Sequence, residues 1–137
     1  MAYQTVLDYI TAFWPQIIRQ QVQDVQTRIG LPKPYIVPSN GEMFQEMYYW
    51  DSFFEALGVV GTEYEHLILD MTENMLYLFN RFGVIPNGSR YYFLSRSQPP
   101  SRTKCERKEP EEGGRPNHVP ILGIVKGLAR KLEGTVE

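Results

Sequence analysis

Phe44-Gln-Glu-Met-Tyr-Tyr-Trp-Asp51 places three adjacent aromatic rings directly before a carboxylate. Further along the chain, Ile85-Pro-Asn-Gly-Ser-Arg-Tyr-Tyr-Phe-Leu-Ser-Arg-Ser-Gln-Pro-Pro100 supplies amide and guanidinium groups among more aromatic rings. The apolar faces of a sugar ring pack on aromatic side chains, while its hydroxyls exchange directional hydrogen bonds with carboxylates, amides and guanidinium groups. The two segments together predict a sugar-binding site.

Helical periodicity dominates the sequence before these segments. Residues 6–14 carry apolar side chains three and four positions apart, as on one face of a helix, and Pro15 should end or kink that helix. A second apolar stripe runs over residues 17–29 and stops at Gly30. Both stretches are predicted to be helices.

The middle of the chain alternates extended and helical signals. Residues 31–38 contain three prolines and should form an extended strand or loop. Residues 50–60 are predicted to be helical. Residues 63–82 form the clearest helical pattern, with Gly83 as a C-terminal cap. Residues 91–94 fit either a short strand or an extended aromatic loop.

The chain changes character after Pro100. Residues 101–117 are charged and contain no aliphatic side chain, which is typical of solvated coil. Residues 119–132 form only a short amphipathic stretch. We therefore expect a fold unit over 1–100 and a divergent, poorly ordered, irregular tail over 101–137. The expected fold class is all-α: antiparallel helix pairs joined by long extended loops.

Composition narrows the class of protein. A chain of 137 residues with 42% apolar and 13% aromatic residues has room for one small globular core. The net charge of −2 gives no reason to expect nucleic acid or an anionic membrane as a partner. His66 has no second ligand at metal spacing, so neither a metal nor another cofactor is expected.

The expected location follows from what the sequence lacks. The first residues do not show the basic start and unbroken apolar run of a signal peptide, and no run approaches the roughly 20 apolar residues that span a bilayer. The single cysteine, Cys105, cannot form an internal disulfide. These features predict a soluble, cytoplasmic protein.

The two segments quoted above resemble the trehalase family, glycoside hydrolase family 37. The family signature Pro-Gly-Gly-Arg-Phe-x-Glu-x-Tyr-x-Trp-Asp-x-Tyr is similar to the stretch from Pro38 to Phe53. The Ile-Pro-Asn-Gly…Arg-Ser-Gln-Pro-Pro segment also matches, and nine positions separate Asn87 from Arg96, as in the family. The resemblance covers roughly residues 1–100 and is strongest over 34–100.

The resemblance implies a fold, an activity and a set of site residues. Family members form an (α/α)6 barrel and hydrolyse α,α-trehalose to two glucose molecules with inversion and without a metal. This chain would then carry part of such a barrel and part of a site for a small sugar. The substrate-binding residues implied by the motifs are Trp50, Asp51, Asn87, Arg96, Ser97 and Gln98.

Two departures from the family pattern bear on function. Met43 stands where the signature has a substrate-binding arginine, and the segment is two residues longer. The acid and base that inverting hydrolysis requires lie, in the family, downstream of the Arg-Ser-Gln-Pro-Pro segment, where this chain diverges. By resemblance the chain is therefore a trehalase-like glycosidase, but the acid and the base are missing from it. We expect the chain to be inactive alone.

Several alternatives stay open at this point. Trp50 and Asp51 also fit a core tryptophan and a helix-initiating carboxylate. Glu46 fits either a local general acid or an ion-paired loop residue. Met43 leaves room for a related (α/α)6 glycosidase that acts on another α-glucoside or on a glycosylglycerate. A non-catalytic sugar-binding fragment is the remaining hypothesis.

Overall fold

The computed structural model describes residues 2–97, which contain three α-helices, one short 3-10 helix and a two-stranded sheet. This part of the chain is mostly helical, as predicted, whereas the small sheet was not predicted. The tail predicted over 101–137 lies outside the described residues. The elements follow in the order α1 (Ala2–Ile17), β1 (Ile18–Arg19), β2 (Tyr35–Ile36), α2 (Tyr49–Val59), α3 (Leu67–Phe82) and η1 (Tyr91–Phe93).

Helix α1 runs through Pro15 to Ile17, so of the two predicted outcomes, an end or a kink, the proline does not end the helix. Pro15 lacks the N–H that would bond one turn back, and α1 ends two residues later, at Ile17. The apolar stripe of α1 meets α2 at Trp14. A Cβ added to Gly58 would lie 3.0 Å from the Trp14 ring, so the ring packs directly on the α2 backbone.

The helix predicted over 17–29 is wrong. The chain instead forms β1 and then a tight turn in which Val25 and Arg28 exchange backbone hydrogen bonds of 3.0 and 2.9 Å. A helix would have buried one face of this stripe, but Val25 is exposed while Ile29 is fully buried. The Ile29 N–H donates to the Ser89 carbonyl, a partner sixty residues away that no local pattern reveals.

The proline-rich stretch is extended, as predicted, and it pairs with β1. β1 and β2 are antiparallel, with Ile18 opposite Ile36. Asn74 of α3 is fully buried and holds the segment just before β2: its Oδ1 accepts from the Lys33 N–H at 3.0 Å, and its Nδ2 donates to the Lys33 carbonyl at 2.9 Å. Because proline segments lack backbone donors, a side-chain amide is an effective partner for them.

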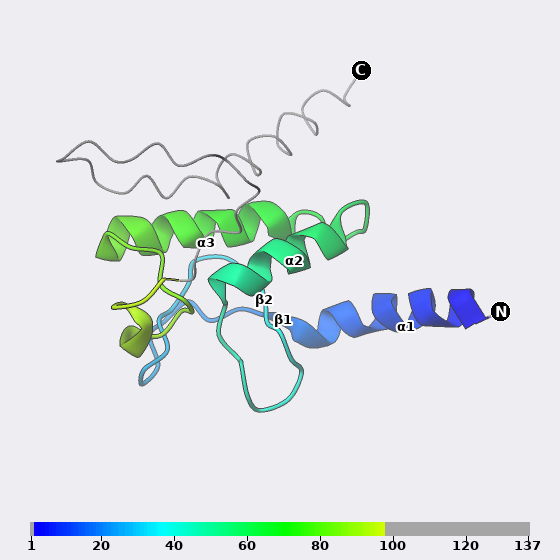
Figure 1. The fold of residues 1–137 in the computed structure, drawn as a ribbon, viewed down its shortest axis with the longest axis horizontal. Coiled ribbons are helices and arrows are strands. Elements are labelled where there is room, and N and C mark those ends of the chain that lie inside the picture. Colours follow the sequence, from blue (N-terminus) through cyan, green and yellow to red (C-terminus); the bar gives the residue numbers. More distant parts are fainter. Residues whose placement is uncertain (1, 98–137) are drawn as a thin grey trace, which may run out of the picture. The chain divides into compact units, whose positions relative to one another are not determined.

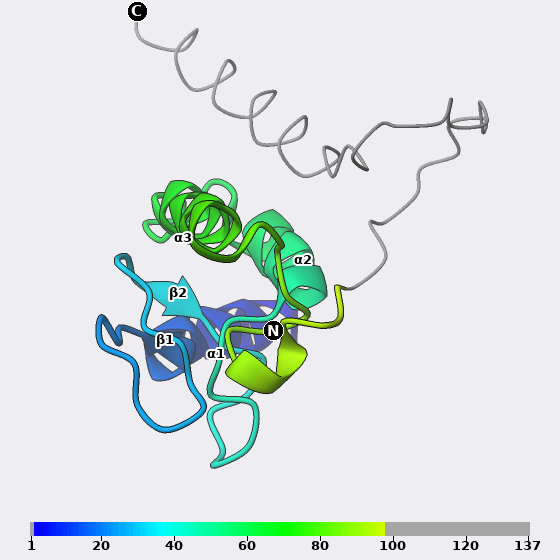
Figure 2. The same cartoon turned by 90° about the vertical axis from the view of Figure 1, so that its left-hand side faces the viewer.

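Helices α2 and α3 pack alongside each other, and α3 also packs on β2 (Figures 1 and 2). α2 confirms the helix predicted over 50–60. α3 begins four residues later than predicted, because residues 62–66 form turns around Thr62, whose Oγ1 donates to the Val59 carbonyl at 2.8 Å. Gly83 ends α3 with φ 74°, and its N–H donates to the Phe79 carbonyl, so the predicted cap is confirmed.

The core lies where α2, α3, the sheet and the segment before α2 meet. Among the described residues, no helix is long and apolar enough to cross a membrane. The largest fully buried side chains belong to Tyr35, Ile29, Leu31, Ile36, Met47, Leu67, Met71, Leu78, Val37, Val59, Asn74 and Pro86.

Candidate functional site

The start of α2 presents the first two candidate residues. Trp50 and Asp51 lie in the first turn of this helix, preceded by Tyr48 in extended conformation. Trp50 is 39% exposed, and its ring centroid lies 5.4 Å from that of Phe54, one turn further along. The indole of Trp50 therefore lies at the surface of α2, and the alternative that Trp50 is a core tryptophan is wrong.

A short antiparallel pairing joins the segment before α2 to the second motif. Tyr48 and Gly88 form a β-bridge, and the Tyr49 N–H donates to the Asn87 carbonyl at 3.0 Å. Ser89 completes the pairing: its N–H donates to the Met47 carbonyl, and its Oγ accepts from the Met47 N–H at 3.1 Å. The backbone of Asn87 is therefore hydrogen-bonded to the residue directly before Trp50.

Gly88 permits this close approach. A Cβ at this position would lie 3.0 Å from the Tyr48 ring and 3.2 Å from the Phe93 ring, closer than side-chain carbons normally come. The Tyr48 and Phe93 rings meet edge to face across the glycine with centroids 6.0 Å apart. A glycine is thus needed between Asn87 and Ser89 for packing, not for an unusual φ.

Asn87 is also tied to the far end of its own motif. Its N–H donates to the Arg96 carbonyl at 2.8 Å, and the Arg96 N–H donates to the Phe93 carbonyl at 2.9 Å. Between them the chain forms η1, a 3-10 helix, instead of the strand or extended loop predicted for residues 91–94. The 3-10 turn shortens the path, so that Asn87 and Arg96 become neighbours.

The structure brings most of the predicted site residues together through the backbone. Trp50 and Asp51 are linked through Tyr49 to Asn87, and Asn87 is linked directly to Arg96. Arg96 and Ser97 are exposed, whereas Asp51 and Asn87 are partly buried. Gln98 lies outside the described residues.

Glu46 is an ion-paired residue and not a free acid. It is 3% exposed, and its Oε1 accepts hydrogen bonds of 2.8 Å from both Arg90 Nε and the Tyr48 hydroxyl. Burial works to raise the pKa of Glu46, but the hydrogen bonds from Arg90 and Tyr48 outweigh it and hold that pKa below its ordinary value. A carboxylate held ionised in this way cannot protonate a leaving oxygen.

Glu55, one turn after Asp51, is the opposite case. Both of its side-chain oxygens are buried and have no hydrogen-bond partner among the described residues. Burial, with a smaller contribution from the Asp51 charge, raises the pKa of Glu55 to about 8. The side chain borders a hollow of about 310 Å³ between α1 and α2, whose walls include Phe13, Trp14 and Phe54. The described residues that line this hollow include no second carboxyl group, and inverting hydrolysis needs two.

The segment that departs from the family signature has an unusual backbone. Phe44 has φ 59°, in the left-handed region that non-glycine residues rarely adopt, and it is 50% exposed. Its ring lies edge-on to Tyr48 with centroids 5.9 Å apart. Met43, which stands where the signature has arginine, is 69% exposed. The backbone thus presents both side chains outward just before the Glu46 ion pair.

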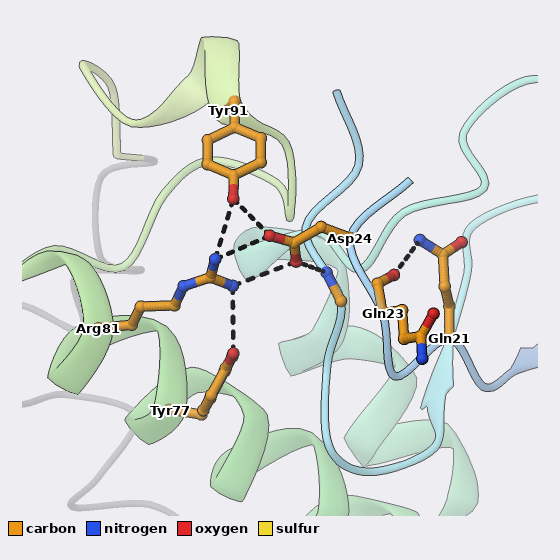
Figure 3. Close-up of polar contacts among 7 residues, drawn as sticks. Gln21, Gln23, Asp24, Tyr77, Arg81 and Tyr91 are labelled. Carbon is orange, nitrogen blue, oxygen red and sulfur yellow. Dashed lines mark hydrogen bonds and ion pairs between the residues drawn. The ribbon is translucent and has the colours of Figure 1, made fainter. Parts of the chain in front are cut away.

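A second polar cluster holds Tyr91, the first residue of η1 (Figure 3). The carboxylate of Asp24 accepts hydrogen bonds from Arg81 of α3 at 3.1 and 2.7 Å, from the Tyr91 hydroxyl and from the Gly30 N–H at 2.7 Å. Tyr77 adds a contact of 3.1 Å between its hydroxyl oxygen and Arg81. These bonds, led by those from Arg81 and Tyr91, lower the pKa of Asp24.

Sequence reasoning did not identify this cluster or Arg90. Arg90 lies inside the second motif, three residues after Asn87, but its partner Glu46 is 44 residues away. The detectable signal was the presence of a glutamate in one motif and an arginine in the other. Among residues 2–97, no group of three or more His, Cys, Asp or Glu side chains is arranged to hold a metal ion.

Comparison with known proteins gives consistent matches. The family model for trehalase matches residues 2–110. A periplasmic trehalase of Xanthomonas campestris pv. campestris (strain B100) is 46% identical over 95 residues, which are 68% of this chain and 16% of that protein. Periplasmic trehalases of Pseudomonas aeruginosa and Escherichia coli O1:K1 / APEC are 46% and 40% identical over 94 and 99 residues.

The matched region is a large part of this chain and a small part of its relatives. The match to the Pseudomonas protein covers 67% of this chain and 17% of that protein. The match to the Escherichia protein covers 71% of this chain and 17% of that protein. The chain therefore spans about a sixth of the length of the curated relatives it matches.

The expected cytoplasmic location is wrong, because these relatives are named periplasmic trehalases. The expectation rested on the absence of a signal-like stretch in the first residues. In a chain that matches a sixth of its relatives' length, that absence says nothing about the compartment.

Proposed function

The chain belongs to the trehalase family, as its motifs predicted, and we propose that it is the N-terminal part of a periplasmic trehalase-like glycosidase. The whole protein would hydrolyse α,α-trehalose to two glucose molecules with inversion. Residues 1–100 would supply the first helices of its (α/α)6 barrel, and residues 101–137 would be a divergent tail. The observation that carries the proposal is the pairing of the two sugar motifs through Tyr49 and Asn87.

The proposed site has one role for each residue. The exposed face of Trp50 would pack against a sugar ring. Asp51 and Asn87 would form hydrogen bonds with its hydroxyls, and Arg96, Ser97 and Gln98 would close the second side. Support comes from the backbone links that hold Asp51, Asn87 and Arg96 in one small region.

We also propose that this polypeptide alone does not hydrolyse trehalose. Inverting glycosidases need an acid and a base about 6.5–9.5 Å apart on opposite sides of the scissile bond. Glu46 is held ionised by Arg90, and the oxygens of Glu55 are enclosed. These two residues do not form such a pair, which supports a chain that does not cleave the sugar.

One observation favours a second candidate substrate. Met43 is 69% exposed at the place where the family signature carries an arginine, so a charged contact is exchanged for a thioether. A different α-glucoside or a glycosylglycerate would then be bound in place of trehalose. A titration with each sugar separates the two candidates.

The test measures sugar binding by the full chain, with ¹⁵N NMR as the detection method. Trehalose should shift the indole signal of Trp50 and leave that of Trp14, which packs on Gly58, in place. Asp51→Ala should abolish the shift, and Asp8→Ala on α1 should preserve it. Incubation with trehalose should release no glucose above a buffer control. Glucose release that Asp51→Ala removes would contradict the proposed inactivity, and an unmoved Trp50 signal would contradict the site.

A further inference from the structure

Glu46 and Arg90 form an ion pair with fixed geometry, in which Glu46 is buried and Arg90 is partly buried. Arg90 Nε donates to Glu46 Oε1 at 2.8 Å, and Arg90 Nη2 donates to Oε2 at 3.1 Å. The glutamate side chain is 4% exposed and the arginine side chain 22%. Because guanidinium and carboxylate are both planar, two parallel hydrogen bonds fix their relative orientation as well as their distance.

Each partner is held from its other side. The Tyr48 hydroxyl donates to Glu46 Oε1 at 2.8 Å, and Arg90 Nη1 donates to Thr27 Oγ1 at 2.8 Å. The Arg90 guanidinium also lies 5.7 Å from the centroid of the Tyr92 ring. The pair thus joins three segments that are far apart in the sequence.

Two of these segments carry the proposed sugar site. Glu46 lies at one end of the antiparallel pairing, and the Tyr49–Asn87 hydrogen bond lies at its other end, next to Trp50 and Asp51. A strand register that slips by one residue turns every side chain to the opposite face. The ion pair joins one residue of each segment, so it opposes such a slip.

Stability alone does not account for this pair. Removing two charges from water costs several kcal/mol per ion, and well-packed apolar replacements of buried ion pairs are often as stable or more so. A fixed register and orientation are what an apolar contact would not provide. The location of the pair between the two site segments points to that role.

We propose that Glu46 and Arg90 are positioning residues of the sugar site. They hold the segment of Asn87 and Arg96 in register with the start of α2, and neither touches the sugar. The inference rests on the proposed function for its sugar readout, but the register it describes is measurable without any sugar.

The decisive variant is the double substitution Glu46→Met with Arg90→Leu. It removes the two parallel hydrogen bonds of the ion pair and fills the space with apolar side chains. We expect a melting temperature close to that of the wild type. We expect amide exchange at Tyr49 and Ser89, whose N–H groups donate across the pairing, to become about tenfold faster or more, while that at Leu78 in α3 is unchanged. Trehalose affinity should fall by a similar factor. Arg81→Lys, which alters the exposed Asp24 pair, is the matched control. It should change neither the amide exchange at the pairing nor the trehalose affinity.

Arg90→Lys provides a second, milder test, because lysine keeps the positive charge but cannot form the two parallel hydrogen bonds of a guanidinium. Faster exchange confined to Tyr49 and Ser89 in either variant supports the positioning role. Unchanged exchange at these two amides, or an equal increase in α3, overturns it. If the wild type binds no trehalose while the exchange result holds, the proposed function fails and the positioning of the two segments stands.

Discussion

Two arginine–carboxylate pairs hold the second motif, one through Arg90 and the other through Tyr91, and they differ in burial. In the Glu46–Arg90 pair the side chains are 4% and 22% exposed, whereas both side chains of the Asp24–Arg81 pair are 33% exposed. Each arginine donates two hydrogen bonds to its carboxylate. The chemistry is equal, so the difference in environment decides what each pair contributes.

Water is the physical reason for the difference. Around Asp24 and Arg81 water solvates both charges whether or not they meet, so the net gain from the pair is small and salt weakens it. Around Glu46 the remaining partner would be left buried and uncompensated if the other were removed. The buried pair is therefore costly to break, while the exposed pair is a local tether between α3, η1 and the loop of Asp24.

The largest effect is expected from breaking the buried pair on one side only. Arg90→Ala leaves the Glu46 carboxylate buried without its main partner, and the free energy of unfolding should fall by about 3–5 kcal/mol. Denaturant titration of the full chain measures this loss. Arg81→Ala is the control and should cost far less. Equal losses in the two variants would remove the distinction between the pairs.

Glu55 sharpens the comparison, because it is a carboxyl with buried oxygens and no hydrogen-bond partner in the described part of the chain. Its pKa is raised to about 8 in the folded chain from an ordinary value of 4.5. Between these values the unfolded chain releases this proton while the folded chain keeps it. The free energy of unfolding should therefore fall as the pH rises from about 4.5 to about 8. The neighbouring groups are Asp51 on the same helix and Tyr9 across the hollow.

The measurement is a series of thermal melts between pH 5 and pH 9. Glu55→Gln keeps the shape and polarity of the side chain but cannot ionise, so it should remove this part of the pH dependence. Glu63→Gln, at an exposed position before α3, should not. A slope that survives in Glu55→Gln would assign the effect to another group.

The exposed pair should give a smaller effect. Asp24→Asn removes the charge that Arg81 meets and should lower the free energy of unfolding by about 1 kcal/mol at low salt, and by less at high salt. The pKa of Asp24 is lowered, so its contribution is present above pH 3.8 and is lost only as the pH falls below that value. Denaturant titrations at two salt concentrations test this, and a loss as large as that of Arg90→Ala would contradict it.

The smallest effect is expected at Lys33 and Glu73, whose ammonium and carboxylate lie 3.3 Å apart with side chains 44% and 56% exposed. Lys33→Ala should change the free energy of unfolding by no more than about 0.5 kcal/mol. Glu73→Ala should behave in the same way. A loss above about 1 kcal/mol in either would show that exposure alone does not rank these pairs.

Local signals identified the elements whose partners lie nearby in sequence. The stripe and the Gly83 cap predicted most of α3, and the prolines before Val37 predicted the extended segment. The same reasoning failed over residues 17–29, because an apolar stripe does not reveal that the Ile29 N–H bonds to Ser89. It also missed η1, where the backbone follows the link between Asn87 and Arg96.

The sequence by itself determined the family and the candidate residues, because each motif is a short, continuous segment. The spacing of its aromatic, carboxylate, amide and guanidinium groups can be compared directly with the family pattern. Only the tertiary structure decided that Glu46 is an ionised partner of Arg90 rather than an acid, and that the Glu55 oxygens have no hydrogen-bond partner within residues 2–97. The charge state of a carboxyl depends on what surrounds it in space, and here those surroundings come from segments that the sequence keeps far apart.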